Sequence, residues 1–156
     1  MAGQDLGSIE APASMENWDR MNDFVSDLIT ESVRDKAKSY KLRLASEELI
    51  SNIIRAAGEV KDSENREVSL RVAARIEEQD GSLWFVVETK DDGRHFDPQF
   101  GSRKPVDTEQ HISEREIGGL GLFLIEQSVD KVLYDWIDGC NTYRLCLEIV
   151  ADAKQP

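Results

Sequence analysis

Apolar residues recur at three- and four-residue steps near the start of the chain, between Met15 and Val33. This spacing places them on one face of an α-helix, the face that packs against a hydrophobic core. Ser14 stands just before the pattern, and serine is a common residue at helix N-caps. We therefore predict a helix from Ser14 onward, preceded by a short strand around residues 5–10.

A second helical pattern runs from about residue 41 to residue 57, after a polar turn at residues 34–40. Gly58 follows this pattern and is predicted to end the helix, because glycine is common at helix C-termini. Residues 60–67 are rich in charge and are predicted to form a loop.

Apolar and polar residues alternate over residues 68–76 and 83–89, a pattern typical of half-buried β-strands. Between them, Gln79-Asp80-Gly81 contains the Asp-Gly pair of two-residue hairpin turns. The second strand runs directly into Asp91-Asp92-Gly93, and a polar stretch without clear periodicity continues to about Ile117. A loop of that length in a small domain usually has a function such as covering a ligand.

The last part of the chain begins with Gly118 to Gly121, which precede a short, apolar third helix. Two strands are predicted after it, at about residues 131–136 and 142–149, and residues 151–156 are expected to fray. Together the elements predict an α/β (α+β) fold. It is a two-layer sandwich in which a mixed, mostly antiparallel sheet carries three helices on one face.

Composition narrows the classes of function. The chain has 156 residues, the usual size of one compact domain, so we expect a single domain over residues 1–156. Acidic residues outnumber basic ones by 31 to 19, which argues against nucleic-acid binding and favours a protein partner with a basic face. No apolar run is long enough to span a membrane, and no signal-peptide pattern is present. We expect a cytoplasmic protein without membrane contact.

Two polar residues on the second predicted helix could carry chemistry. Glu48 and Asn52 are one turn apart, so their side chains lie together beside the apolar face. A carboxylate there can orient or deprotonate an attacking oxygen, and an amide oxygen can join the oxygen shell of Mg²⁺. Taken alone, such a pair is more often part of a solvated helix face.

Two glycine-bearing segments could form the ends of a nucleotide pocket. Asp91, at the end of a strand, can accept a hydrogen bond from an exocyclic amine such as that of adenine, and Gly93 lets the backbone approach a flat ring. Gly118, Gly119 and Gly121 stand where a helix begins, and such glycine-rich starts bind phosphate through backbone N–H groups. Each motif alone is more often an ordinary turn, but their order along the chain favours ATP.

Four segments also carry a family resemblance: LASEELISNII (44–54), KDDGRHFDP (90–98), REIGGLGLFLI (115–125) and VDKVLY (129–134), which leads to Gly139-Cys140-Asn141. Their order resembles the Bergerat-fold (GHKL) ATP-binding superfamily, which includes the ATPase domains of gyrase, heat-shock chaperones and histidine kinases. Within it, the chain looks like the small anti-sigma-factor serine/threonine kinases of bacteria. The likeness covers about residues 15–149, the core of what would be a histidine-kinase-like ATP-binding domain.

The resemblance implies roles for the matching residues. Glu48 would be the base that activates the attacking hydroxyl or water, and Asn52 would be the Mg²⁺ ligand. Asp91 would hold the adenine amine, with Gly93 giving it room. Residues 94–117 would form an ATP lid. The remaining nucleotide-binding positions would be Gly118, Gly119, Leu120, Gly121 and Leu122, with Phe96 and Leu122 as supporting apolar residues.

The resemblance further implies a regulatory kinase that uses Mg-ATP to phosphorylate a small anti-sigma-antagonist protein. It allows contact with a sigma factor and, with the Trp18 helix, makes a homodimer plausible. Two alternatives stay open: a non-catalytic, ATP-dependent module that sequesters a regulator, and a free-standing GHKL ATPase domain. The chain departs from the family pattern at Ala56-Ala57-Gly58, where His-Ala-Tyr is common, and at Arg94-His95, so affinity or turnover is expected to differ.

Overall fold

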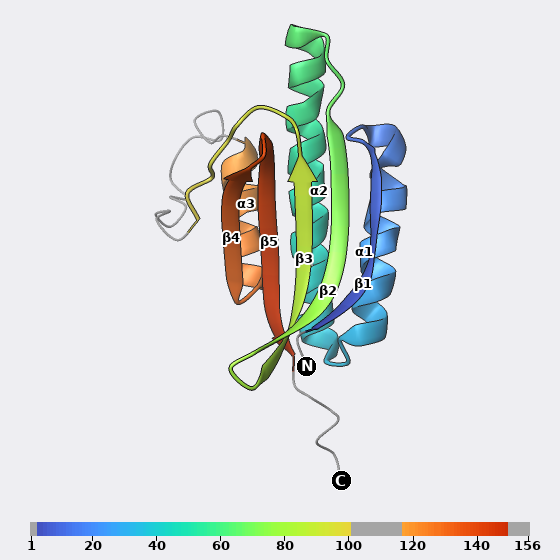
Figure 1. The fold of residues 1–156 in the computed structure, drawn as a ribbon, viewed down its shortest axis with the longest axis vertical. Helices are drawn as coiled ribbons and strands as arrows, with labels where there is room; N and C mark the ends of the chain where they lie inside the picture. Colours follow the sequence, from blue (N-terminus) through green and yellow to red (C-terminus); the bar gives the residue numbers. More distant parts are fainter. Residues whose placement is uncertain (1–2, 101–116, 150–156) are drawn as a thin grey trace.

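The computed structural model describes residues 3–100 and 117–149, and Figure 1 shows their arrangement. Its sheet has five strands in the order β1-β2-β3-β5-β4, and every neighbouring pair is antiparallel. The strands are β1 (Gly3–Pro12), β2 (Ser69–Gln79), β3 (Ser82–Asp91), β4 (Lys131–Ile137) and β5 (Cys140–Ile149). The expected tail at 151–156 and residues 101–116 of the expected lid lie outside the described residues.

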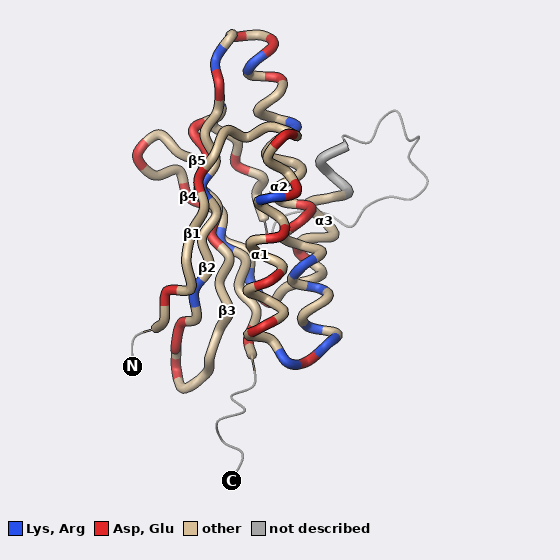
Figure 2. The backbone as a smooth tube through the Cα atoms, turned by 90° about the vertical axis from the view of Figure 1, so that its right-hand side faces the viewer, with Lys and Arg blue, Asp and Glu red and all other residues tan. Residues whose placement is uncertain are grey.

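All helices of the described chain lie on one face of this sheet (Figures 1 and 2). They are the 3₁₀ turn η1 (Met15–Asn17) and the α-helices α1 (Trp18–Ser32), α2 (Lys36–Glu64) and α3 (Ile117–Ser128). The core lies between the two layers, where the side chains of Ile29, Leu49, Phe85, Ile125 and Leu145 are buried. Burying each such side chain contributes about 1.5–3 kcal/mol. The two-layer sandwich is therefore confirmed.

Two tight turns join neighbouring antiparallel strands of the sheet. All described strand pairs are antiparallel, where the sequence predicted a mixed, mostly antiparallel sheet. Asp80 and Gly81 join β2 to β3 with φ angles of 53° and 81°. Asp138 and Gly139 join β4 to β5 with φ angles of 52° and 77°. Two consecutive positive φ angles define the turns that connect adjacent antiparallel strands. The predicted hairpin of β2 and β3 is thus confirmed, and the two predicted closing strands form a second hairpin.

The second helix is longer than its sequence pattern predicted. α2 starts at Lys36, because the Asp35 carboxylate accepts a hydrogen bond from the Lys38 N–H at 3.0 Å and caps it. It continues through Gly58 to Glu64 and ends at Asn65, whose φ of 52° is left-handed. The predicted stop at Gly58 is wrong, because one glycine costs a helix only about 1 kcal/mol and burial of Val60 in the core offsets that cost.

Replacing Gly58 with Ala is expected to stabilise the protein by about 1 kcal/mol, because alanine is the better helix former. A methyl group at this position would have no neighbour within 4 Å. For a chain of this size the melting temperature would rise by about 2–4 °C, measured by circular dichroism. A lower melting temperature would contradict a continuous helix through Gly58.

The first helix also begins differently from the prediction. Ser14 precedes the 3₁₀ turn η1 and makes no side-chain capping bond, and the α-helix itself begins at Trp18. The Trp18 indole N–H donates to Ser51 Oγ at 2.8 Å. This bond joins α1 to α2 at the residue next to Asn52. In the described part of the chain, no helix is long and apolar enough to cross a membrane.

Candidate functional site

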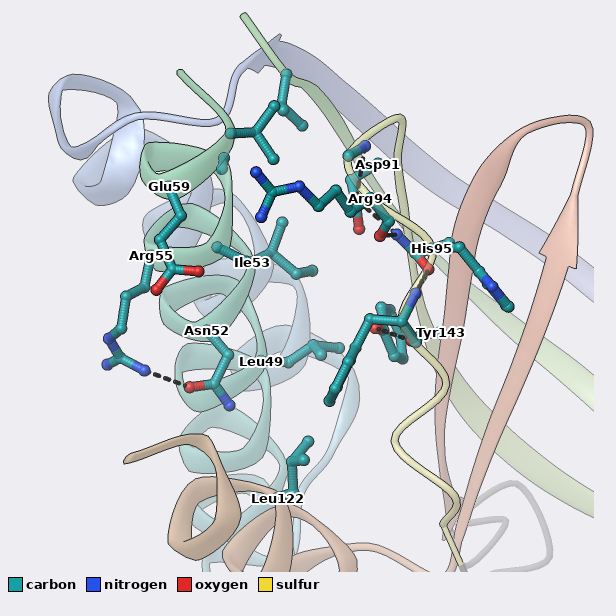
Figure 3. Close-up of a pocket in the computed structure, with 17 residues that line it drawn as sticks. Leu49, Asn52, Ile53, Arg55, Glu59, Asp91, Arg94, His95, Leu122 and Tyr143 are labelled. Atoms are coloured by element: carbon teal, nitrogen blue, oxygen red, sulfur yellow. Dashed lines mark hydrogen bonds between the residues drawn. The ribbon is translucent and has the colours of Figure 1, made fainter. Parts of the chain in front are cut away.

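A cavity of about 360 Å³ lies between α2 and the end of the sheet where β3 stops (Figure 3). One wall is the α2 segment that contains Leu49, Asn52, Ile53 and Val60. The opposite wall comes from the end of β3, the 92–100 loop and β5, and Leu122 of α3 closes one end. From the second wall the lining residues are Asp91, Gly93, Arg94, His95, Phe96, Asn141 and Tyr143.

Asp91 provides a buried carboxylate at one end of this cavity. It is the last residue of β3 and only 6% exposed. Its Oδ1 accepts hydrogen bonds from the Gly93 N–H at 3.0 Å and from Asn141 Nδ2 at 3.1 Å. Burial raises the pKa of Asp91, and these two bonds oppose that rise. Both bonds use Oδ1, so Oδ2 remains available to a ligand that donates a hydrogen bond.

At this end of the cavity there is no room for a side chain at position 93, so a glycine is needed there. A methyl group on Gly93 would lie 2.9 Å from Asp91 Oδ1, closer than non-bonded atoms approach, and 3.6 Å from a Val68 methyl. Glycine therefore allows the turn to fold back onto the carboxylate, which is the close approach that the sequence predicted for it.

Asn141 organises this end of the cavity, and sequence reasoning did not identify it as a site residue. It pairs with Asp91 across β3 and β5. Besides Asp91, its Nδ2 donates to the Arg94 carbonyl at 2.7 Å. Its Oδ1 accepts from the Phe96 N–H at 3.0 Å and from the Tyr134 hydroxyl at 2.7 Å. Only its place next to the Gly139 turn hinted at a role.

Tyr143 is a second lining residue that the sequence did not single out. Its hydroxyl donates to the Phe96 carbonyl at 3.2 Å, and burial raises its pKa, so the phenol stays protonated. Together with Asn141 it fixes the 92–100 loop to β5. The loop after Asp91 is therefore held in place by side chains of the sheet.

Glu48, Asn52 and Gly121 lie together next to the other end of the cavity. A methyl group on Gly121 would lie 2.7 Å from Glu48 Oε2 and 3.1 Å from Asn52 Nδ2. The chain thus brings these three residues into direct contact across α2 and α3, although Glu48 and Gly121 do not line the cavity itself. The Asn52 Nδ2 is buried without a hydrogen-bond partner. Asn52 Oδ1 accepts from Arg55 Nη1 at 2.8 Å, and Arg55 is another lining residue that the sequence did not single out.

The glycine-rich segment lies within α3. Because α3 begins at Ile117, the backbones of Gly118, Gly119 and Leu120 form the first turn of the helix. The sequence pattern placed the glycines before the helix, and the structure corrects this by one turn. Gly121 is buried between α3 and α2, and Leu122 is 6% exposed and lines the cavity. Phe96 also lines the cavity, but its side chain is 53% exposed.

The residues fit a purine nucleotide with a divalent cation. Asp91 offers a hydrogen-bond acceptor among apolar lining residues. Asn52 offers an amide oxygen, which here accepts from Arg55 Nη1 at 2.8 Å, and a buried Nδ2 whose donor is unused. Gly121 leaves free the space that a side chain would fill between Glu48 and Asn52. Among the described residues, no cluster of three or more His, Cys, Asp or Glu could hold a metal alone. Asn52 with phosphate and water oxygens is the kind of shell that Mg²⁺ accepts.

An antiparallel sheet covered on one face by three helices, with a polar-ended cavity between α2 and the sheet, defines a GHKL-type, or Bergerat, sandwich. Residues 11–147 match the family model of the histidine kinase-like ATPase domain. The chain belongs to this family. Among curated proteins, no significant match was found.

Proposed function

We propose that this protein binds Mg-ATP in the cavity between α2 and the sheet. The observation that carries the proposal is one cavity with two polar lining residues: buried Asp91 at one end and, toward the other, Asn52, which contacts Gly121 beside Glu48. Asp91 would accept the hydrogen bond of an exocyclic amine. Asn52 would hold Mg²⁺ through its amide oxygen, which would exchange its hydrogen bond with Arg55 for the ion. Gly118 to Gly121 would supply backbone N–H groups to phosphate oxygens.

We further propose that the protein is a regulatory serine/threonine kinase of the anti-sigma-factor type. Bound ATP would supply the phosphoryl group, and a hydroxyl of a small anti-sigma-antagonist protein would receive it. Glu48 would take the proton of that hydroxyl. The support is the position of Glu48 one helical turn from Asn52, together with the motif order that resembles these kinases. The acidic chain, with a net charge of −12, favours a partner with a basic face.

A second candidate function is binding without turnover, in which ATP shapes a surface that sequesters a sigma factor or another regulator. One observation favours it: Glu48 packs against Gly121 and does not line the cavity. A free-standing ATPase activity is the third candidate.

The experiment that separates the kinase from the binding module is a pull-down from native lysate with ATP and Mg²⁺, followed by mass spectrometry for phosphoserine and phosphothreonine on the captured proteins. Phosphorylated prey supports the kinase, and unmodified prey supports the binding module.

Glu48→Gln is expected to spare ATP binding and to lower phosphate transfer or hydrolysis by at least about 100-fold. The amide keeps the shape that packs against Gly121 but cannot accept the proton. The measurement is release or transfer of radiolabelled phosphate, with affinity measured in parallel by calorimetry. Glu47→Gln is the matched control, because Glu47 is the exposed neighbour on the same helix. Retained transfer in Glu48→Gln would overturn the assignment of Glu48 as the base.

A further inference from the structure

Arg94 is fixed to both walls of the cavity. Its carbonyl accepts a hydrogen bond from Asn141 Nδ2 at 2.7 Å, and the same nitrogen donates to Asp91 Oδ1 at 3.1 Å. The backbone of Arg94 therefore lies at the Asp91 end of the cavity, next to the carboxylate. Its side chain also lines the cavity.

The side chain of Arg94 reaches across to the last turn of α2. Arg94 Nε donates to Glu64 Oε2 at 2.7 Å, and Nη2 donates to Ser63 Oγ. Figure 3 shows the guanidinium extending from the 92–100 loop toward α2. The continuation of α2 beyond Gly58 places Ser63 and Glu64 there. One side chain thus spans the opening between the loop and the helix.

Further bonds hold the turn that carries Arg94, and they share Glu64 with the first set, because Arg66 Nε also lies 3.6 Å from Glu64 Oε1. Arg66 Nη1 donates to the Asp92 carbonyl at 2.8 Å, and the Ser69 N–H donates to Asp92 Oδ1 at 2.8 Å. None of these three residues lines the cavity. The Ser69–Asp92 bond and the two bonds to Asp91 Oδ1 involve neither Glu64 nor the Arg94 side chain, so the link between Arg94 and Glu64 can break while the turn and Asp91 stay in place.

The link is of a kind that opens easily. The side chains of Arg94 and Glu64 are 51% and 42% exposed. Exposed ion pairs contribute little to stability and are weakened by salt. The pair is therefore suited to close over a ligand and to release it, and poorly suited to hold the fold together.

We infer that Arg94, bonded to Ser63 and Glu64, is a strap across the base end of the nucleotide pocket that sets how fast a nucleotide leaves. This inference rests on the proposed nucleotide site. The strap depends on the length of the Arg94 side chain. A smaller residue at this position would not reach from the 92–100 loop to Ser63 and Glu64. The strap slows release of the base that Asp91 would hold. It does not act on the phosphates, which α3 would bind.

The test measures the release rate of a fluorescent ADP, labelled on the ribose with a methylanthraniloyl group, from the full chain. Excess unlabelled ADP displaces it in a stopped-flow instrument. Glu64→Gln is expected to speed release by about twofold to fivefold, the range of an exposed ion pair. Release from the wild-type protein should accelerate with ionic strength, whereas release from Glu64→Gln should respond much less. The melting temperature of the free variant should stay close to that of the wild type.

Two further variants distinguish the strap from a general charge effect. Glu31→Gln removes another exposed carboxylate, on α1, and should leave the release rate unchanged. Arg94→Gln should speed release as much as Glu64→Gln does, and the double variant should release no faster than either single one, because all three lack the same link. If the wild type binds labelled ADP and Glu64→Gln releases it at the wild-type rate, the strap is overturned and the nucleotide site stands. If the wild type binds no labelled ADP, the nucleotide site fails and the strap with it.

Discussion

Asp91→Asn is expected to abolish the rise in melting temperature that ATP with Mg²⁺ produces in the wild-type protein. At a hundredfold excess over the dissociation constant, a ligand stabilises the folded state by about 2.7 kcal/mol, or about 5–10 °C for a chain of this size. Asparagine keeps one oxygen that can accept from Gly93 and Asn141. Its NH₂ group takes the place of Oδ2, where the amine of a base would need an acceptor. The affinity loss is expected to be on the order of 100-fold.

The same substitution is expected to stabilise the protein without ligand. Burial raises the pKa of the Asp91 carboxyl in the folded state. The protonated carboxyl therefore favours folding below the pKa of the unfolded chain, and this stabilisation is lost as pH rises through the pKa of the folded state. At neutral pH the buried carboxylate therefore destabilises the fold, and asparagine removes that charge. In thermal melts from pH 3 to pH 8, the melting temperature of Asp91→Asn minus that of the wild type should increase with pH.

Asp19→Asn is the control for both measurements, because Asp19 is exposed on α1 and does not line the cavity. It should keep the full ATP-dependent shift. An Asp91→Asn variant that melts normally and still gains the wild-type shift with ATP would remove Asp91 from the site. Failure of the wild type to respond to millimolar nucleotide would remove the site altogether.

Gly121→Ala is expected to separate function from stability. Its methyl group would lie 2.7 Å from Glu48 Oε2, so the carboxylate must move, and 3.1 Å from Asn52 Nδ2. The fold can tolerate this, because the nearest atom is the end of a flexible side chain and alanine favours a helix by about 1 kcal/mol over glycine. Phosphate transfer is expected to fall by about 100-fold or more, since displacements of about 1 Å in a catalytic group have that effect.

Gly58→Ala provides the matched comparison, because it adds the same methyl group to a helical glycine with open space around it. Both variants should melt at or above the wild-type temperature, but only Gly121→Ala should lose ATP-dependent stabilisation and transfer. Wild-type transfer by Gly121→Ala would show that the contact with Glu48 and Asn52 has no functional consequence. A strongly destabilised Gly121→Ala would show that the contact is a packing requirement.

The turns and hairpins were predictable from sequence because their causes are local. The Asp-Gly pair at Asp80 and Gly81 adopts positive φ with little dependence on the rest of the chain, and alternation on either side then defines the strands. The length of α2 was not predictable in the same way. Gly58 is a local stop signal, but the helix continues because Val60 is 2% exposed in the core, and that burial depends on distant strands.

In the candidate site, too, some residues were predictable from local motifs and others only from long-range contacts. By itself the sequence determined the order of Glu48, Asn52, Asp91 and Gly121, because each belongs to a short motif with its own spacing. Only the tertiary structure decided that Asn141 bonds Asp91, fifty positions away, and that Arg94 reaches Ser63 and Glu64. Such contacts follow from strand register and helix length, which long-range packing determines and no local pattern encodes.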